Sequence, residues 1–454
     1  MKELKPSQFN VFVKDYPQQG EHLLYQTLTG SLVCLDDNGL SVLQSPDAAM
    51  NSESLIQGLQ KRGFLVPQAS DEGRHYLQSL DDRREQKGGQ LYVTLLTNLQ
   101  TCPLACVYCY QKGAHHGGRL SGEVSDRTLA FIKQQCLKVE AEKLWISYYG
   151  SEPLSYPKAI FETATALKAF CEEHGLRFRF GMVTSGVLLT RELVERLTPL
   201  GFCHAQITID GNRSTHNATR PFQNGKGTYD VIMQNLDAYA GQIRTDVLCV
   251  LNEERIEAAY ELVDTLAEKG LAQRHVRVIF SPESPDYSSE TVQATKKRFA
   301  LDGDSLKQQE RALLVEQVKL AIYAYKRGLL DDLLPRRTWC AMQRHDEKHL
   351  VIEPDGTLRT CPTMIGRDAE YAAGHIDTGV GGIDTALKQN YQRSEQCITC
   401  RYLPICADCR VDALQHKGDL AASDSREADF DAIVPLLMKG YYNVTRATKS
   451  ALCG

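Results

Sequence analysis

The chain has 454 residues, of which 42% are hydrophobic and 24% charged, a composition typical of a soluble globular protein with two or three domains. Its net charge is −5, from 57 acidic and 52 basic residues without a Lys/Arg-rich block, which argues against nucleic acid as the main partner. The N-terminus lacks an apolar signal region and no run approaches eighteen apolar residues, so we expect a cytoplasmic protein without a membrane span.

The first ninety residues predict a small winged-helix-like domain over 1–88. Residues 23–37 have the pattern of a β-hairpin, 54–63 of a helix and 63–67 of a short strand. The charged segment 79–89 then predicts a connector to the next domain.

From residue 89 to about 305 the sequence alternates strand and helix patterns. Six strands are expected at 91–99, 143–150, 177–186, 203–210, 244–251 and 275–280. Helices are expected between them at 125–139, 156–175, 190–197, 228–240 and 255–270. Six βα units predict a parallel sheet with right-handed crossovers, as an α/β partial (β/α)6 barrel. Its site should lie at the carboxyl ends of the strands.

The remaining residues, 306–454, form a third expected domain. Residues 281–304 are polar and predict a loop, and 308–328 have the pattern of a helix. The composition becomes rich in cysteines and turn residues from Cys340 onward.

Three cysteines follow the first barrel strand directly, with the spacing C-x3-C-x2-C at Cys102, Cys106 and Cys109. Fifteen cysteines in a reducing compartment favour metal binding or catalysis over disulfides. Three thiolates can hold three irons of a [4Fe–4S] cube and leave the fourth iron open. The alternative is a zinc site completed by a remote Cys or by His115 or His116. The position at the barrel mouth favours the cluster.

This pattern, with Tyr108 just before the third cysteine, resembles the radical S-adenosylmethionine (SAM) superfamily. The resemblance implies a [4Fe–4S] cluster whose open iron binds the amino and carboxylate groups of SAM. It also implies that one electron from the cluster cleaves SAM to a 5′-deoxyadenosyl radical. An electron donor such as flavodoxin or ferredoxin would supply that electron.

Two further motifs resemble those of the family at the ends of strands two and three. The segment "YYGSEP" is similar to G-G-E-P, with Ser151 in place of the second glycine. The resemblance implies that Gly150 gives a turn and that Glu152 holds the methionyl ammonium. In "TSG", Thr184 and Ser185 would meet the ribose or the carboxylate of SAM. Alternatively, Glu152 simply begins the next helix.

Strand four ends in "QITIDG", which resembles S-I-D-G, with Thr208 at the usual serine and Asp210 beyond it. Residues 214–230 resemble the H-D-x-x-R segment of the family, and Arg220 is the expected carboxylate contact. The alternatives are that Asp210 belongs to a turn and that Arg220 and His216 brace the loop.

The C-terminal cysteines resemble the SPASM extension of radical SAM enzymes, which carries two auxiliary iron–sulfur clusters. The resemblance implies one cluster on Cys397, Cys400, Cys406 and Cys453, and a second on Cys340, Cys361 and Cys409. Cys361 follows an expected hairpin around Gly356. Because only seven thiols are present for eight positions, we expect an open or non-cysteine fourth position in the second cluster. A zinc ribbon, a [2Fe–2S] cluster, or a Ser, His or Asp ligand are the alternatives.

SPASM members of the superfamily mostly modify peptides or proteins, and the N-terminal domain resembles the leader-binding domain of peptide maturases. We therefore expect a peptide maturase that installs a thioether, carbon–carbon or ether crosslink in a ribosomally synthesised precursor with a leader. The alternatives are an anaerobic sulfatase-maturating enzyme, which forms formylglycine, and a zinc-binding scaffold protein. The N-terminal domain is alternatively a structural cap. The sequence identifies no catalytic acid or base.

Overall fold

The computed structural model describes residues 3–46, 52–109, 111, 118–283, 303–336, 347–366, 372–381, 395–406 and 426–452. The chain forms two compact units, each discontinuous in sequence. One comprises residues 1–84, 332–340 and 391–454, and the other residues 85–331 and 341–390. The domain boundaries expected at 88/89 and 305/306 stay a prediction.

The larger unit, 85–331 with 341–390, contains a ten-stranded mixed sheet of order β11-β10-β9-β8-β7-β6-β12-β13-β14-β15. Strands β6 to β11 are neighbours in sequence order and pair in parallel throughout. Their bounds are Gln90–Leu96, Lys143–Tyr149, Arg177–Thr184, Phe202–Thr208, Arg244–Leu251 and Val276–Pro282. The α/β class and the six parallel strands predicted from the sequence are therefore confirmed.

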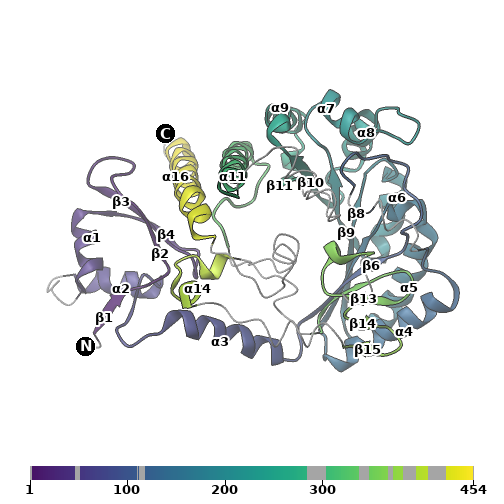
Figure 1. Cartoon of the computed structure of the whole chain (residues 1–454), viewed down its shortest axis with the longest axis horizontal. Helices are drawn as coiled ribbons and strands as arrows, with labels where there is room; N and C mark the ends of the chain where they lie inside the picture. The colour runs from purple at the N-terminus through teal and green to yellow at the C-terminus, as the bar shows by residue number, and fades with distance from the viewer. Residues whose placement is uncertain are drawn as a thin grey trace. The chain divides into compact units, whose positions relative to one another are not determined.

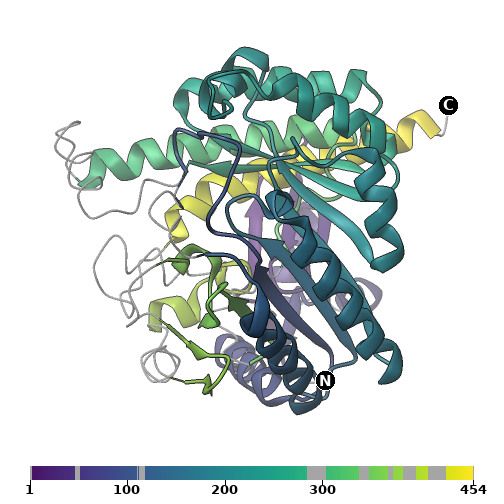
Figure 2. The same cartoon turned by 90° about the vertical axis from the view of Figure 1, so that its right-hand side faces the viewer.

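Helices cover one face of this sheet (Figures 1 and 2). They are α4 (Gly122–Lys138), α5 (Pro157–Glu173), α6 (Arg191–Leu197), α8 (Tyr229–Tyr239) and α9 (Ile256–Glu268). Alternate strand residues such as Leu91, Val93 and Leu95 are fully buried in the same apolar cluster as Ile132 of α4. Their neighbours Tyr92 and Trp145, whose rings stack at 6.4 Å, lie on the opposite face because strand side chains alternate.

Strand β12 (His349–Ile352) extends the sheet beyond the six expected strands. It pairs in parallel with β6, and β13 (Thr357–Arg359) returns beside it as the hairpin predicted around Gly356. The short strands β14 (Gly374–His375) and β15 (Gly379–Val380) follow. The pairing with β6 was not predicted, because a four-residue strand is placed by a partner far away in sequence rather than by its own pattern.

The smaller unit contains an antiparallel sheet of β2 (Asn10–Val13), β3 (Glu21–Gln26) and β4 (Leu32–Asp36), which confirms the predicted hairpin. β1 (Leu4–Pro6) pairs with β5 (Leu65–Pro67). Three helices accompany them: α1 (Asp37–Gln44), α2 (Glu53–Lys61) and α3 (Glu72–Glu85). The winged-helix and SPASM assignments stay predictions.

Helix α3 occupies most of the segment in which the sequence predicts a connector. Its Tyr76 and Leu80 side chains are buried against Phe9 and Leu403, so an apolar face holds this charged segment as a helix. The contact with Leu403 is far away in sequence, which explains why local composition did not indicate it.

The C-terminal part of this unit packs against its N-terminal part. The hydroxyl of Thr27 donates to the carbonyl of Arg401 at 2.7 Å, and the Tyr402 hydroxyl donates to Asp431 at 2.6 Å. The last helix, α16 (Glu427–Leu452), contacts β2 and β3. The remaining α-helices of the described ranges are α7 (Arg213–Thr219), α11 (Gly303–Lys326) and α14 (Glu395–Thr399). Within the described ranges, each helix is too short or too polar to cross a membrane.

Candidate functional site

The loop with the three cysteines leaves the carboxyl end of β6 and is held by the segment that follows α7. The amides of Ala105 and Val107 donate to the carbonyls of Pro221 and Thr219 at 2.8 and 2.9 Å. The amide of Gln223 donates in turn to the carbonyl of Pro103 at 2.9 Å. The cysteine loop and residues 219–223 are therefore held together by backbone hydrogen bonds of the kind that pair β-strands.

Asn98, which was not singled out from the sequence, fixes the start of this loop. Its side chain is fully buried, and Nδ2 donates to the carbonyls of Thr101 and Glu152 at 2.7 and 3.1 Å. Its Oδ1 accepts from the amides of Gln100 and Thr101. An asparagine directly after a buried strand is a recognised turn signal and could have indicated it.

The three thiols differ in exposure. Cys106 is buried, whereas Cys102 and Cys109 are partly exposed. Burial raises the pKa of Cys102 to about 12, and it also raises the pKa of Cys106 although the charge of Arg220 opposes this. These two thiols therefore hold their protons until a metal replaces them.

Three soft thiols from one loop match the ligand set of an iron–sulfur cluster. Among the side chains that the structure describes, no three His, Cys, Asp or Glu are already gathered closely enough to hold a metal ion. The three cysteines share a loop that is anchored at several backbone positions, so closing on a cluster requires local adjustment rather than refolding.

Glu152 lies at the carboxyl end of β7 and is completely buried. Its carboxylate accepts hydrogen bonds from the amide of Leu154 at 3.1 Å, the hydroxyl of Thr184 at 2.7 Å and the amide of Ser185 at 2.8 Å. The Ser185 hydroxyl donates as well. Glu152 thus caps the short helix η3 (Pro153–Ser155) and at the same time joins the ends of two strands.

The turn before Glu152 has a left-handed backbone at two positions. Gly150 has φ +92°, and a Cβ there would lie 3.1 Å from the carbonyl oxygen of Asn98 and from Cγ of Leu96. Ser151 has φ +41°, and its amide donates to Oε1 of Gln111 at 2.6 Å. A serine therefore occupies a conformation that favours glycine.

Asp210 is completely buried and joins three chain segments. One carboxylate oxygen accepts from the hydroxyls of Tyr108 and Thr219, the latter at 3.1 Å, and the other accepts from the amide of Val250 at 3.2 Å. The Tyr108 hydroxyl accepts from Arg220 Nη1 at 3.0 Å. Burial raises the pKa of Tyr108, so its phenol remains protonated and can bridge the two charges.

His216 braces this region, which was one of the alternatives for the segment. Its Nδ1 accepts from the amide of Asp210 at 3.0 Å, and Nε2 lies 2.9 Å from Thr228 Oγ1. Since Thr228 donates its hydroxyl proton to the carbonyl of Arg220, Nε2–H of His216 must be the donor. Burial, aided by the charge of Arg220, lowers the pKa of His216 to about 3, so it is neutral at neutral pH.

Arg255 is a second buried cation at this site that sequence analysis missed. It follows β10, and its Cζ lies 5.2 Å from the centroid of the Tyr108 ring. Its Nη2 pairs with Glu283 at 2.9 Å. A cation four residues after the end of the fifth strand, at the same sheet edge as the other motifs, could have indicated it.

Two guanidinium nitrogens beside Tyr108 are orphaned. In the described part of the chain, buried Nη1 of Arg255 and buried Nε of Arg220 have no hydrogen-bond partner. Buried donors are normally paired, so these two N–H groups are available to an anionic group. Thr208 is also buried and ends β9 at the same edge of the sheet.

The C-terminal cysteines that the structure describes fall in different units. Cys361 follows β13 in the larger unit, and its sulfur lies 3.0 Å from Thr363 Oγ1. Cys397, Cys400 and Cys406 lie close together in sequence in the smaller unit, where the amide of Cys400 donates to the carbonyl of Cys397 at 3.2 Å. Cys340, Cys409 and Cys453 lie outside the described residues.

Comparison with known proteins identifies the class. Residues 99–266 match the sequence model of the Radical SAM superfamily. The chain therefore contains a radical SAM domain, as the cysteine pattern predicted.

Several known proteins are similar to this chain at low identity. The chain is 21% identical to a serine-type anaerobic sulfatase-maturating enzyme of Klebsiella aerogenes, over 67% of this chain and 76% of the relative. It is 25% identical to a PqqA peptide cyclase of Ruegeria pomeroyi, over 74% of this chain and 87% of the relative. It is also 24% identical to an AdoMet-dependent heme synthase of Methanosarcina barkeri, over 70% of this chain and 90% of the relative.

A solved structure shares the fold. Native anSMEcpe with bound AdoMet and Cp18Cys peptide superimposes with a TM-score of 0.59 at 17% identity, over 78% of this chain and 99% of that one. At this identity the likeness concerns the fold alone.

Proposed function

We propose that this chain is a radical SAM enzyme that abstracts a hydrogen atom from a precursor peptide and installs a crosslink in it. The observation that carries the proposal is the arrangement at one sheet edge, where a three-thiol loop, a buried carboxylate and two orphaned guanidinium donors come from β6, β7, β10 and the segment after α7. Two relatives, the peptide cyclase and the sulfatase-maturating enzyme, support a peptide or protein substrate.

Cys102, Cys106 and Cys109 would hold three irons of a [4Fe–4S] cluster. When bound, the cluster and SAM supply a 5′-deoxyadenosyl radical, which removes a hydrogen atom from the substrate. The loop that carries these cysteines is closed from one side by residues 219–223, which would limit the access of water to it.

Glu152 would hold the ammonium group of SAM, because it is a buried carboxylate at the end of β7. The hydroxyls of Thr184 and Ser185 now donate hydrogen bonds to Glu152, and the ammonium would take the place of one of them. The hydroxyl released in this way, with Thr208 at the next strand end, could then bind the ribose or the carboxylate. Gly150 would keep the turn before Glu152 narrow.

Arg220 and Arg255 would bind the carboxylate of SAM through their orphaned N–H groups. Tyr108 lies between them and is fixed by Asp210, so both guanidinium groups are already positioned before a ligand arrives.

The C-terminal cysteines would hold two auxiliary iron–sulfur clusters. Cys397, Cys400 and Cys406 are spaced along one short turn-rich segment, as a shared cluster with Cys453 would require. Cys361 would belong to the other cluster, with Cys340 and Cys409 and a fourth position that is open or not a cysteine.

Anaerobic reconstitution followed by incubation with SAM and dithionite, in place of the biological flavodoxin or ferredoxin, tests the class. The protein should bind about twelve irons if all three clusters are [4Fe–4S] and should release 5′-deoxyadenosine. A colourless protein that binds only zinc would instead identify a scaffold protein. A peptide that loses two hydrogen atoms in the reaction and contains no aldehyde would identify an oxidative crosslink.

A second function, formylglycine formation, is supported by the similarity to the anaerobic sulfatase-maturating enzyme. Both functions predict radical chemistry on a peptide, so only the product separates them. Incubation with a sulfatase peptide that contains the target Cys or Ser should leave that peptide unchanged if the chain is a crosslinking enzyme. Conversion of the residue to an aldehyde would favour the second function.

A further inference from the structure

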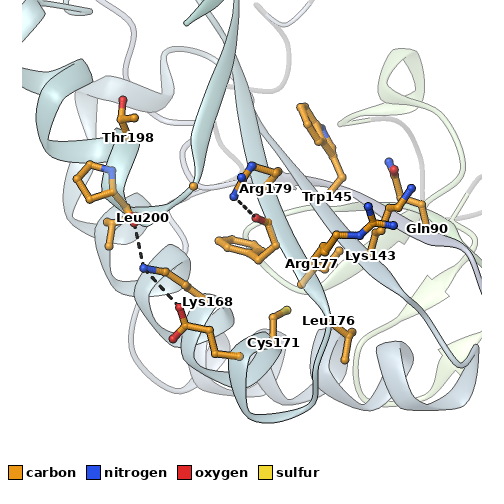
Figure 3. Close-up of a pocket in the computed structure, with 15 residues that line it drawn as sticks. Gln90, Lys143, Trp145, Lys168, Cys171, Leu176, Arg177, Arg179, Thr198 and Leu200 are labelled. Atoms are coloured by element: carbon orange, nitrogen blue, oxygen red, sulfur yellow. Dashed lines mark hydrogen bonds and ion pairs between the residues drawn. The ribbon is translucent and has the colours of Figure 1, made fainter. Parts of the chain in front are cut away.

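A cavity of about 650 Å³ lies at the amino-terminal ends of β7 and β8, opposite to the end that carries the cysteine loop. Its walls come from these strands, from the second half of α5 and from the segment before β9 (Figure 3). Its size is typical of a ligand site rather than of a packing defect. Residues at this end of a barrel usually serve stability, so a cavity here calls for a separate explanation.

The cavity carries an excess of positive charge. Lys143, Lys168, Arg177 and Arg179 line it together with one carboxylate, that of Glu172. Of these four cations, Lys168 has an acidic partner: its Nζ lies 3.5 Å from Glu172 and also donates to the carbonyl of Pro199 at 3.0 Å. The protein as a whole has a net charge of −5, so this accumulation is local.

The other three cations have no acidic partner in the described part of the chain. Arg179 donates only to the carbonyl of its neighbour Phe178, at 3.2 Å, and neither Lys143 nor Arg177 has a side-chain partner there. By contrast, Arg244 and Arg277, further along the same sheet, both pair with Asp331. The structure thus satisfies its cations on β10 and β11 and leaves those on β7 and β8 available.

The spacing of these cations matches an extended peptide. Lys143 lies opposite Arg177 in the register of β7 and β8, and Trp145 lies opposite Arg179. Arg177 and Arg179 are two residues apart on one face of a strand, which separates their Cα atoms by about 6.6 Å. Alternate side chains of an extended peptide have this same period, whereas a single phosphate would need donors that converge on one point.

We propose that this cavity binds an acidic segment of the peptide substrate, with Lys143, Arg177 and Arg179 pairing with its carboxylates and Trp145 packing on an adjacent side chain. That the ligand is the substrate rests on the proposed function. Strand β8 runs through eight residues from Arg177 to Thr184 at the cofactor end. This length of strand, about 23 Å, corresponds to roughly seven extended residues, so the acidic segment should lie at least that far from the residue that is modified.

Binding of a defined probe to the reconstituted full chain tests the proposal. The probe is a fluorescein-labelled peptide of alternating Gly and Glu, compared with the same peptide carrying Gln in place of Glu, and the readout is fluorescence anisotropy. We expect the Glu peptide to bind more tightly than the Gln peptide, and less tightly as salt rises. The double variant Arg177→Gln/Arg179→Gln should bind it about tenfold more weakly.

The matched control is Lys158→Gln/Arg191→Gln, which removes the same charge from two exposed ion pairs, with Glu162 and Glu195, on α5 and α6. It should bind the Glu peptide as the unaltered protein does. Three results would each overturn the proposal. They are equal binding of the Glu and Gln peptides, an equal loss of affinity in both double variants, and displacement of the probe by inorganic phosphate at the probe's own concentration.

The same protein samples separate this inference from the proposed function. If the Glu peptide binds through Arg177 and Arg179 but no peptide stimulates release of 5′-deoxyadenosine, the binding site stands and the peptide maturase assignment fails. If a precursor is modified equally well after its acidic residues are replaced by amides, the function stands and the inference fails.

Discussion

The amide of Ser185 donates a hydrogen bond to Oε2 of Glu152 at 2.8 Å, across 33 positions of sequence. This contact joins the carboxyl end of β8 to that of β7, and Thr184 adds a second bond to the same carboxylate. The fully buried carboxylate of Glu152 thus accepts hydrogen bonds from several donors on two strand ends. The motif around Glu152 and the motif of Thr184 and Ser185, which are separate in sequence, therefore form one hydrogen-bonded group.

Replacing Glu152 with Gln should damage both binding and stability. The side-chain amide would point an N–H toward groups that already donate to Glu152, such as the Ser185 amide, which should lower the free energy of unfolding by about 1–3 kcal/mol. Loss of the negative charge should also weaken SAM binding at least about tenfold. Urea unfolding and equilibrium dialysis with labelled SAM would measure the two effects. The control is Glu142→Gln, an exposed acid before β7. Wild-type affinity for SAM in the Glu152 variant would contradict its assigned role.

Replacing Cys106 with Ala should remove one cluster and leave the others. Iron content should fall by about four atoms per chain, and release of 5′-deoxyadenosine should cease. Iron analysis and chromatography of the products would check this. Cys34→Ser, at an exposed position without an assigned role, should behave like the unaltered protein. An unchanged iron content after the Cys106 replacement would refute the cluster assignment.

His216 should make stability depend on pH. It stays neutral in the folded state to a pKa of about 3, whereas the unfolded chain gains the proton near pH 6.5. Acidification from pH 6.5 toward 3 therefore favours the unfolded state, by up to about 1.4 kcal/mol per pH unit.

Unfolding in urea at several pH values, with the unaltered protein and His216→Asn, would measure this contribution. The variant should be less stable at pH 7.5 but should lose less stability on acidification. His275→Asn, at an exposed histidine, should keep the slope of the unaltered protein. Identical slopes in all three proteins would show that His216 titrates normally.

Replacing Ser151 with Gly should stabilise the protein. Ser151 has φ +41°, where a side chain is disfavoured. Relief of this strain in the folded state should outweigh the entropic cost of the more flexible unfolded chain, so the free energy of unfolding should rise by about 0.5–1 kcal/mol. Thermal unfolding would detect the change. Ser155→Gly, in the short helix η3, should have the opposite effect, and a loss of stability in both variants would show that the Ser151 side chain contributes bonds that outweigh its strain.

Long regular segments were predicted well from the sequence, and contacts between distant segments were not. Strands β6 to β11 each contain an apolar pattern long enough to be recognised without a partner. The pairing of β12 with β6, and the buried face of α3, depend on residues hundreds of positions away.

The same distinction applies to the candidate site. Cys102, Glu152 and Asp210 stand in recognisable motifs, so their positions at strand ends could be expected. Arg255 and Asn98 belong to no such motif, and their importance follows only from the buried partners that the fold brings to them. The sequence left open whether His216 braces the loop, and its contacts with Asp210 and Thr228 decide in favour of the brace.

The smaller unit is built from both ends of the chain, with Thr27 bonded to Arg401 and α16 contacting β2 and β3. During translation its first strands therefore leave the ribosome long before their packing partners exist. The N-terminal sheet should therefore remain exposed to proteases until residues 395–452 have been synthesised, and a product that terminates before them would lack the packing partners of Thr27, β2 and β3.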